Sequence, residues 1–175
     1  MGIDEKQMKS KITNYKEIYR TFPSFPSVLV VVKDNIITVS MVHTFSFQPL
    51  IMGIGVSPKR YSYSLLRKSN RFSINIPYSE HLEIVKFCGE KSGRNINKFK
   101  EKELKYKLLE RCRIIEEFPV NIVIEKKKEI EIGDHTWFLG EVVACYKDRN
   151  YNINDTIMYW GGQYRIPGKV IEKRS

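Results

Sequence analysis

The sequence predicts a mainly β protein: an antiparallel barrel, closed or partly closed, with a few peripheral helices. Three observations predict it. Short runs of strand length recur along the chain, helical periodicity is confined to brief stretches, and strands and helices do not alternate as in a parallel βα fold. Because 175 residues can build one core and no linker or repeat divides them, we expect one domain over 1–175. Residues 1–22 are expected to form an N-terminal extension whose helix packs on the barrel.

The first half of the chain is expected to hold a helix over 14–19, ended by Phe22-Pro23, followed by strands over 27–32, 36–42 and 50–56. The first two strands would form a hairpin around Lys33-Asp34-Asn35, and residues 45–49 break the strand pattern. Ser57-Pro58 has the residues of a helix start, with Ser57 as N-cap. The buried side of that helix would hold Tyr61, Leu65 and Leu66.

The second half begins with an alternating strand over 71–76 and a helix over 81–87, followed by a loop and a short helix within 89–99. Three later strands are expected over 120–126, 128–132 and 136–146, with a turn at Gly133-Asp134. The glycines and proline of 161–168 indicate a loop-like C-terminal segment.

Charge and composition narrow the class of function. The chain has 30 basic and 20 acidic residues, a formal charge of +10. No basic stripe with interleaved aromatics indicates nucleic acid, and the three histidines and three cysteines lack metal-ligand spacing. The apolar runs are too short to span a bilayer and no secretory signal is visible, so we expect a cytoplasmic protein without a membrane partner. The basic excess remains compatible with a phosphorylated ligand or an acidic protein partner.

Four places carry candidate chemistry, each with a plain structural alternative. The segment from Ser57 to Ser64 contains the serine hydroxyls and, in Lys59 and Arg60, the cations that bind a phosphate monoester. It equally fits a capped surface helix that carries exposed basic residues. Thr38 and Ser40 share one strand face, where they would bond a heterocycle or face solvent. His135 lies in a turn, and spacing alone favours a surface histidine. The loop at Ser92-Gly93-Arg94 would either contact a ligand or simply connect two helices.

Taken in order, these pieces resemble one family. The matching stretches are 28–32, 34–40, 44–50, 57–63, 72–77, 88–89, 92–94, 98–99, 133–135 leading into 138–142, and 161–164. Together they resemble the flavin reductase-like, FMN-binding split-barrel proteins, and among these the flavoredoxin and ferric-reductase branch. The resemblance runs from the first strand to near the C-terminus. It implies a Greek-key split β-barrel that forms a homodimer, with FMN in a cleft near the interface.

The resemblance also implies roles for single residues. Asn35, Thr38, Val39 and Ser40 would lie along the flavin ring and ribityl chain, and Lys59, Arg60 and Ser62 would hold the phosphate. The following loop would bring Ser92 and Lys98 near the flavin, and Tyr164 would pack on it. His135 would stand over the ring and orient the nicotinamide, while Lys98 would favour the anionic reduced flavin.

The resemblance implies an oxidoreductase that moves a hydride from NADH or NADPH to FMN, and electrons onward to an acceptor. The residues do not distinguish the two nicotinamides, and free flavin, ferric complexes, a protein or a quinone-like molecule all remain compatible acceptors. An alternative function is that of an FMN electron carrier without NAD(P)H activity, serving an acidic protein such as a ferredoxin. A third is a flavin- or heme-binding module without turnover.

Overall fold

The computed structural model describes residues 11–172 of the chain. The first ten residues of the expected N-terminal extension lie outside the described residues. No helix within 11–172 combines the length and apolar character needed to cross a membrane.

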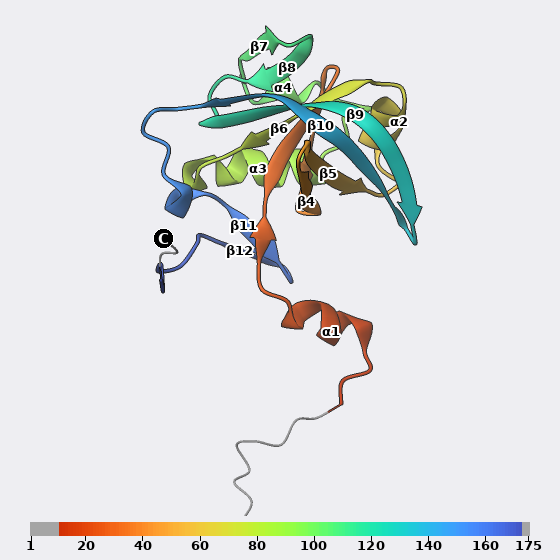
Figure 1. Cartoon of the computed structure of the whole chain (residues 1–175), viewed down its shortest axis with the longest axis vertical. Helices are drawn as coiled ribbons and strands as arrows, with labels where there is room; N and C mark the ends of the chain where they lie inside the picture. Colours follow the sequence, from red (N-terminus) through yellow and green to blue (C-terminus); the bar gives the residue numbers. More distant parts are fainter. Residues whose placement is uncertain (1–10, 173–175) are drawn as a thin grey trace, which may run out of the picture.

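A seven-stranded antiparallel sheet forms the body of the molecule (Figure 1). Its strands, in spatial order, are β3 (Asn35–Val39), β2 (Val28–Val32), β6 (Arg71–Ile76), β9 (Val120–Ile132), β10 (His135–Lys147), β5 (Leu50–Val56) and β4 (Val42–Phe47). The two edge strands, β3 and β4, follow each other in the chain, so the sheet curls back on itself. At their connection the Gly55 N–H donates to the carbonyl oxygen of Met41 at 2.7 Å. The prediction of a mainly β, partly closed antiparallel barrel is confirmed.

The apolar run of β2 is buried on both faces because two cores meet there. Val28, Val30 and Val32 point into the barrel core. Leu29 and Val31 belong to a second core with helix α3 (Leu82–Glu90) and Phe99 of the short helix α4 (Lys98–Glu101). A strand covered on both sides has an almost continuous apolar sequence rather than an alternating one, which is the pattern that predicted this strand.

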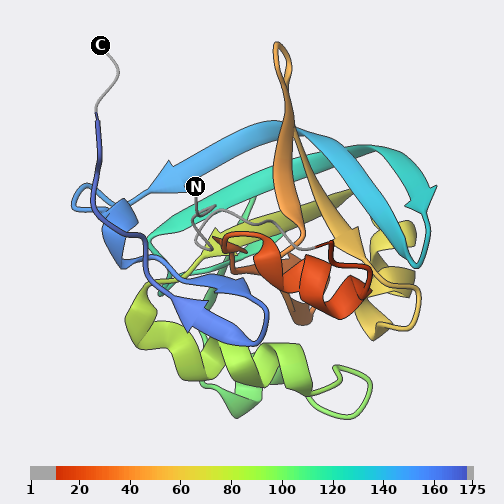
Figure 2. The same ribbon diagram turned by 90° about the horizontal axis from the view of Figure 1, so that it is seen from below.

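Smaller elements flank the barrel. A three-stranded sheet holds β1 (Phe25–Pro26), β11 (Met158–Trp160) and β12 (Gln163–Arg165), and a separate hairpin holds β7 (Tyr106–Leu109) and β8 (Cys112–Ile115). The remaining elements are helices α1 (Tyr15–Thr21) and α2 (Tyr61–Arg67) and the short 3-10 turns η2 (Ser79–His81) and η3 (Ile153–Asp155). Figure 2 shows α1 beside the β11–β12 hairpin, where the Tyr19 ring lies 4.1 Å from that of Trp160. The helix of the extension therefore contacts the small sheet.

Several predicted elements were wrong in detail. The strand expected over 36–42 is divided at Ser40-Met41, where the chain leaves β3 and crosses to β4. The two strands expected over 120–126 and 128–132 are one strand, β9, with a bulge at Lys127 opposite Leu139 and Gly140. Gly140 is required there, because a β-carbon on it would lie 2.4 Å from the carbonyl oxygen of Glu125.

The start of helix α2 and part of the C-terminal segment were also predicted incorrectly. Ser57 does not cap helix α2, which begins at Tyr61 after Arg60; instead, the Ser57 carbonyl accepts from the Arg60 N–H at 3.0 Å and closes a turn. The segment over 161–168, expected to be loop-like, supplies the turn and the second strand of the β11–β12 hairpin, with Gly161 and Gly162 at φ of 61° and 87°, and has no regular structure after Arg165. Side chains with a β-carbon rarely adopt these angles.

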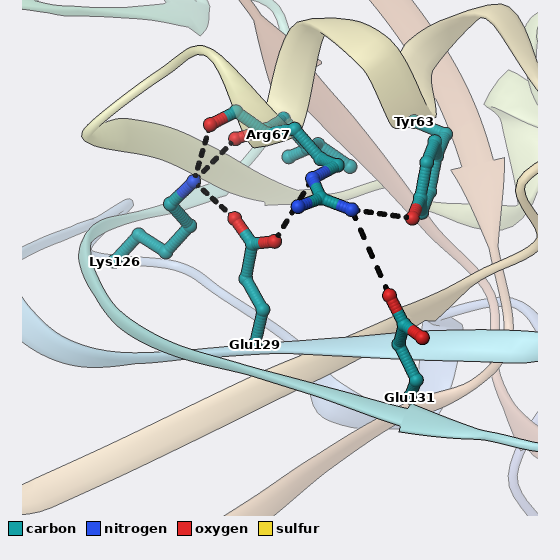
Figure 3. A network of polar contacts seen from close by, with 6 residues as sticks. Tyr63, Arg67, Lys126, Glu129 and Glu131 are labelled. Carbon is teal, nitrogen blue, oxygen red and sulfur yellow. Dashed lines mark hydrogen bonds and ion pairs between the residues drawn. The ribbon is translucent and has the colours of Figure 1, made fainter.

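A polar network ties α2 to the long strand β9 (Figure 3). The Lys126 ammonium donates to the carbonyl oxygens of Leu66 and Arg67, at 2.7 and 2.9 Å, and to Glu129 at 2.6 Å. Arg67 pairs with the same carboxylate at 3.3 Å. Lys126 thus occupies the C-terminal end of α2, where a helix leaves carbonyl groups unpaired and favours a cation.

Replacing Lys126 by methionine is expected to lower the free energy of unfolding by about 1–3 kcal/mol, because two carbonyls and one carboxylate lose a donor that is mostly shielded from water. The Lys126 side chain is 12 % exposed, whereas that of Lys127 is 49 % exposed and pairs only with Glu125. Urea unfolding of both methionine variants should therefore show a clear loss for Lys126→Met and a change within about 0.5 kcal/mol for Lys127→Met. Equal losses would mean that the network does not stabilise the fold.

Candidate functional site

A cleft of about 520 Å³ opens between the edge of the barrel and the small sheet. One wall is built from β3, the following Ser40-Met41 link and the end of α3; the other is built from Tyr159, Trp160 and Tyr164. Tyr19 of α1 and His135 at the start of β10 complete the lining. The cleft therefore joins an edge strand, a helix end and a group of aromatic rings, and it is large enough for a small-molecule ligand.

Six residues predicted from the sequence line this cleft: Thr38, Val39, Ser40, Arg60, His135 and Tyr164. The Thr38 hydroxyl donates to the carbonyl oxygen of Val85 in α3 at 2.6 Å, so its remaining capacity is that of an acceptor. Val39 is 5 % exposed and its side chain belongs to the barrel core. Toward the cleft, Val39 therefore offers its backbone rather than its side chain.

The His135 imidazole is held by its neighbour at the rim of the cleft. Its Nδ1 donates to Oδ1 of Asp134 at 2.7 Å, which leaves Nε2 available for another partner. The hydrogen bond and the charge of His135 hold the pKa of the Asp134 carboxyl below its usual value. On the opposite wall, burial raises the pKa of the Tyr164 hydroxyl, and the Tyr159 and Tyr164 rings lie 4.7 Å apart.

A smaller pocket of about 130 Å³ adjoins the cleft and shares Ile37, Arg60, Gly89 and Glu90 with it. It gathers the other predicted residues Lys59, Ser62, Ser92 and Lys98. Asn35 lies behind it: the buried Asn35 amide donates to the Ser62 hydroxyl at 2.7 Å. The Ser62 oxygen therefore receives a hydrogen bond while its own proton can be directed elsewhere. The structure places Asn35 as a support for Ser62.

Lys98 is 3 % exposed, and its ammonium donates to the carbonyl oxygens of Ile36 and Cys88, both at 2.7 Å. Burial lowers its pKa, and the charge of nearby Arg60 acts in the same direction. These bonds join β3 to the end of α3, the two elements that wall the pocket. Lys98 lies with Lys59 and Arg60, at the basic end of the site, whereas His135 and Tyr164 line the larger cleft.

The sequence interpretation missed part of the aromatic wall. Tyr159 and Trp160 line the cleft from β11, and Tyr19 reaches it from α1. The signal for the first two was the aromatic pair directly before Gly161-Gly162, which marks a strand that ends in a tight turn. Nothing in the local sequence distinguishes Tyr19 from an ordinary surface tyrosine.

The donor set has a clear chemical character. The cleft offers hydroxyl oxygens, backbone groups and aromatic rings, and the small pocket offers the cationic side chains of Lys59 and Arg60 beside a serine hydroxyl. This arrangement fits a flat, weakly polar molecule with a short anionic tail. Within residues 11–172 no group of three or more His, Cys, Asp or Glu side chains is placed to hold a metal ion.

Comparisons with known proteins agree with this character. The family model described as flavin reductase like domain matches residues 19–168. An uncharacterized protein of Archaeoglobus fulgidus is 30% identical over 154 residues, 84% of this chain and 87% of that protein. Among solved structures, a flavoredoxin from Methanosarcina acetivorans has a TM-score of 0.83 at 24% identity and covers 95% of both chains. An NADH:FAD oxidoreductase from Streptomyces globisporus has a TM-score of 0.77 at 18% identity, over 91% of this chain and 98% of that one.

Proposed function

Since this chain belongs to the family of flavin reductase like domain proteins, we propose that it is an FMN-binding oxidoreductase that takes a hydride from NADH or NADPH. One observation carries the proposal. An aromatic- and hydroxyl-lined cleft adjoins a small basic pocket, and Arg60 lines both of them. A flavin ring would occupy the aromatic cleft, and the terminal phosphate of FMN would occupy the adjoining basic pocket.

The size of the basic pocket suits the single phosphate that ends FMN. Its volume is about 130 Å³, enough for a phosphate group. Lys59, Arg60 and Ser62 would bind the phosphate, with Asn35 and Lys98 fixing the pocket behind them. The ring would lie beside Thr38, Val39 and Ser40, facing Tyr164 and Trp160.

Bound FMN would supply the two-electron chemistry, and the residues of this chain would supply position and charge. His135, held by Asp134 through Nδ1, presents Nε2 at the cleft and would orient the nicotinamide. The aromatic rings of β11 and β12 would exclude water from the site. Lys98 would add positive charge from the phosphate end of the site, and a cation near a bound flavin favours its reduced, anionic form.

Anaerobic titration tests this function. The purified chain loaded with FMN is expected to lose its yellow absorbance on addition of NADH or NADPH in a stoichiometric amount. His135→Ala should slow this bleaching at low nicotinamide concentration and leave FMN affinity unchanged, because His135 is proposed to position the donor only. A holoprotein that keeps its colour with both nicotinamides contradicts the reductase assignment.

A second candidate is an FMN electron carrier that exchanges electrons with an acidic protein such as a ferredoxin. The net charge of +10 favours it, because a basic surface attracts an acidic partner at low ionic strength. In the same anaerobic experiment a carrier would be bleached by reduced ferredoxin and not by the nicotinamides. Its rate would fall as salt screens the attraction.

We also propose that the chain forms a homodimer. No residue of α1 is buried; its Tyr15 and Ile18 are 74 and 45 % exposed, and Phe22, the residue directly after the helix, is 57 % exposed. The spacing of three residues places Tyr15 and Ile18 on one helix face, and together with the exposed Phe22 they form an apolar surface that a second copy would cover. Sedimentation equilibrium should give a dimer for the native chain, and the triple replacement of these residues by serine should weaken it. A monomer at all concentrations would contradict the proposal.

A further inference from the structure

A depression of about 700 Å³, larger than the cleft, shares no lining residue with it. We call it the cationic pocket. Its lining comes from the turn after β2, the link between α2 and β6, the β7–β8 hairpin and Glu125 of β9. Its charged residues are Lys33, Lys68, Arg71, Arg111 and Arg113 against Asp34 and Glu125. Five basic and two acidic groups leave an excess of three positive charges around one concavity.

Two arginines hold the turns that form this pocket. Arg71 Nη1 donates to the carbonyl oxygen of Glu110, in the β7–β8 turn, at 2.5 Å. Arg113 Nη1 donates to the carbonyl oxygen of Lys33, in the β2–β3 turn, at 3.4 Å, and its guanidinium lies 4.5 Å from the centre of the Tyr106 ring. The two turns are thereby held in place, and a site with fixed charges loses less entropy when it binds a ligand.

The remaining cations of the pocket have no anionic partner. Among the residues that the structure describes, no carboxylate lies within 4.0 Å of Lys33, Lys68 or Arg111. On the neighbouring surface of α2 and β9 the opposite holds, because Arg67 and Lys126 share Glu129 (Figure 3). Of the pocket cations, Arg71 does have carboxylates within 4.0 Å, those of Glu110 and Glu125, whereas Lys33, Lys68 and Arg111 are left without one among the described residues.

Two of these cations lie in tight turns. Lys33 and Arg111 belong to the two-residue turns of the β2–β3 and β7–β8 hairpins and have φ of 56° and 58°, the positive values that such turns use. Each hairpin turn therefore contributes a long cationic side chain to the lining of the pocket.

We propose that the cationic pocket binds a compact polyanion, a molecule with two or more phosphate or carboxylate groups. Guanidinium and ammonium groups bind both kinds of anion, and the volume lies in the range of small-molecule sites. No aromatic side chain is among the lining residues, so the pocket has no ring on which a nucleotide base would stack. This site is independent of the proposed flavin chemistry.

Calorimetric titration of the full, FMN-loaded chain with tripolyphosphate and with citrate, at low salt, tests the proposal. Saturable binding is expected, and the double variant Lys33→Gln/Arg111→Gln should weaken it about tenfold or more. The matched control Lys147→Gln/Arg149→Gln removes two exposed charges outside the pocket and should change the affinity by less than about threefold. Flavin absorbance and melting temperature, measured on every variant, keep this result separate from flavin binding and from folding.

Each outcome decides the proposal. Binding of tripolyphosphate alone supports a phosphate ligand, and comparable binding of citrate supports a polycarboxylate. No saturable binding of either anion overturns the proposal, as does an equal loss in the two double variants, which would reflect net charge only. If Lys33→Gln/Arg111→Gln does not fold, Lys68→Gln on the exposed link after α2 replaces it, and an unchanged affinity in that variant overturns the proposal.

Discussion

Arg60→Ala is expected to weaken FMN binding by about 10- to 100-fold, while riboflavin binding changes by less than about threefold. Arg60 lines both the cleft and the basic pocket, and a hydrogen bond to a charged group is worth about 1.5–3 kcal/mol. Riboflavin has the same ring and ribityl chain but no phosphate, so it makes no use of the guanidinium. Quenching of flavin fluorescence on titration with the apoprotein measures both affinities.

Arg149→Ala is the matched control for this experiment, because Arg149 is exposed and lines none of the pockets of the site. Its FMN affinity should stay within about twofold of the native value. Equal losses for FMN and riboflavin in Arg60→Ala would show that the phosphate does not bind at Arg60. The ring and tail would then have to be placed in the opposite order.

Lys98→Met is expected to lower the free energy of unfolding by about 2–4 kcal/mol. Methionine keeps the length of the side chain, but the carbonyl oxygens of Ile36 and Cys88 lose their shared donor in a buried position. The variant no longer buries a charge, which by itself would stabilise the fold. The loss of two hydrogen bonds outweighs this gain, since each buried acceptor left without a donor costs about 1–3 kcal/mol. Chemical denaturation with a fixed m-value measures the change.

The control is Lys100→Met, two residues away on the exposed side of α4, where the change should stay within about 0.5 kcal/mol. A second readout separates stability from the flavin role: with one positive charge fewer in the site, the potential of bound FMN should fall in Lys98→Met and not in Lys100→Met. An unchanged potential together with lower stability would make Lys98 a structural residue only. Unchanged stability would contradict the role of its two hydrogen bonds.

The barrel could be predicted where neighbouring residues in the sequence are buried together and a turn follows directly. The run from Val28 to Val32 and the turn at Lys33-Asp34 predict the β2–β3 hairpin, which the structure confirms. The break at Ser40-Met41 could not be predicted, because the apolar pattern continues while the chain changes its partner strand. The β7–β8 hairpin was missed because charged residues alternate through Lys105 and Lys107, and only Cys112, Ile114 and Ile115 of the two strands are fully buried.

The candidate site was predictable mainly on its barrel side. Thr38, Ser40, Arg60 and His135 lie in stretches that resemble the family, and the structure places all four around one cleft. The opposite wall depends on pairing between Phe25 in β1 and Tyr159 in β11, which are far apart in the chain. Local patterns do not report such long-range contacts, so Trp160 was missed as a lining residue. Tyr164 was found because it lies in the stretch 161–164 that resembles the family.

The measurement that tests the central claim most directly is a crystal structure of the chain with FMN. The phosphate is expected to lie within hydrogen-bond distance of Arg60 and Ser62, with Lys59 beside it, and the ring beside Thr38 to Ser40. The ring should face Tyr164, with His135 at the open side. FMN bound with its phosphate outside the basic pocket, or bound away from this cleft, would contradict the account.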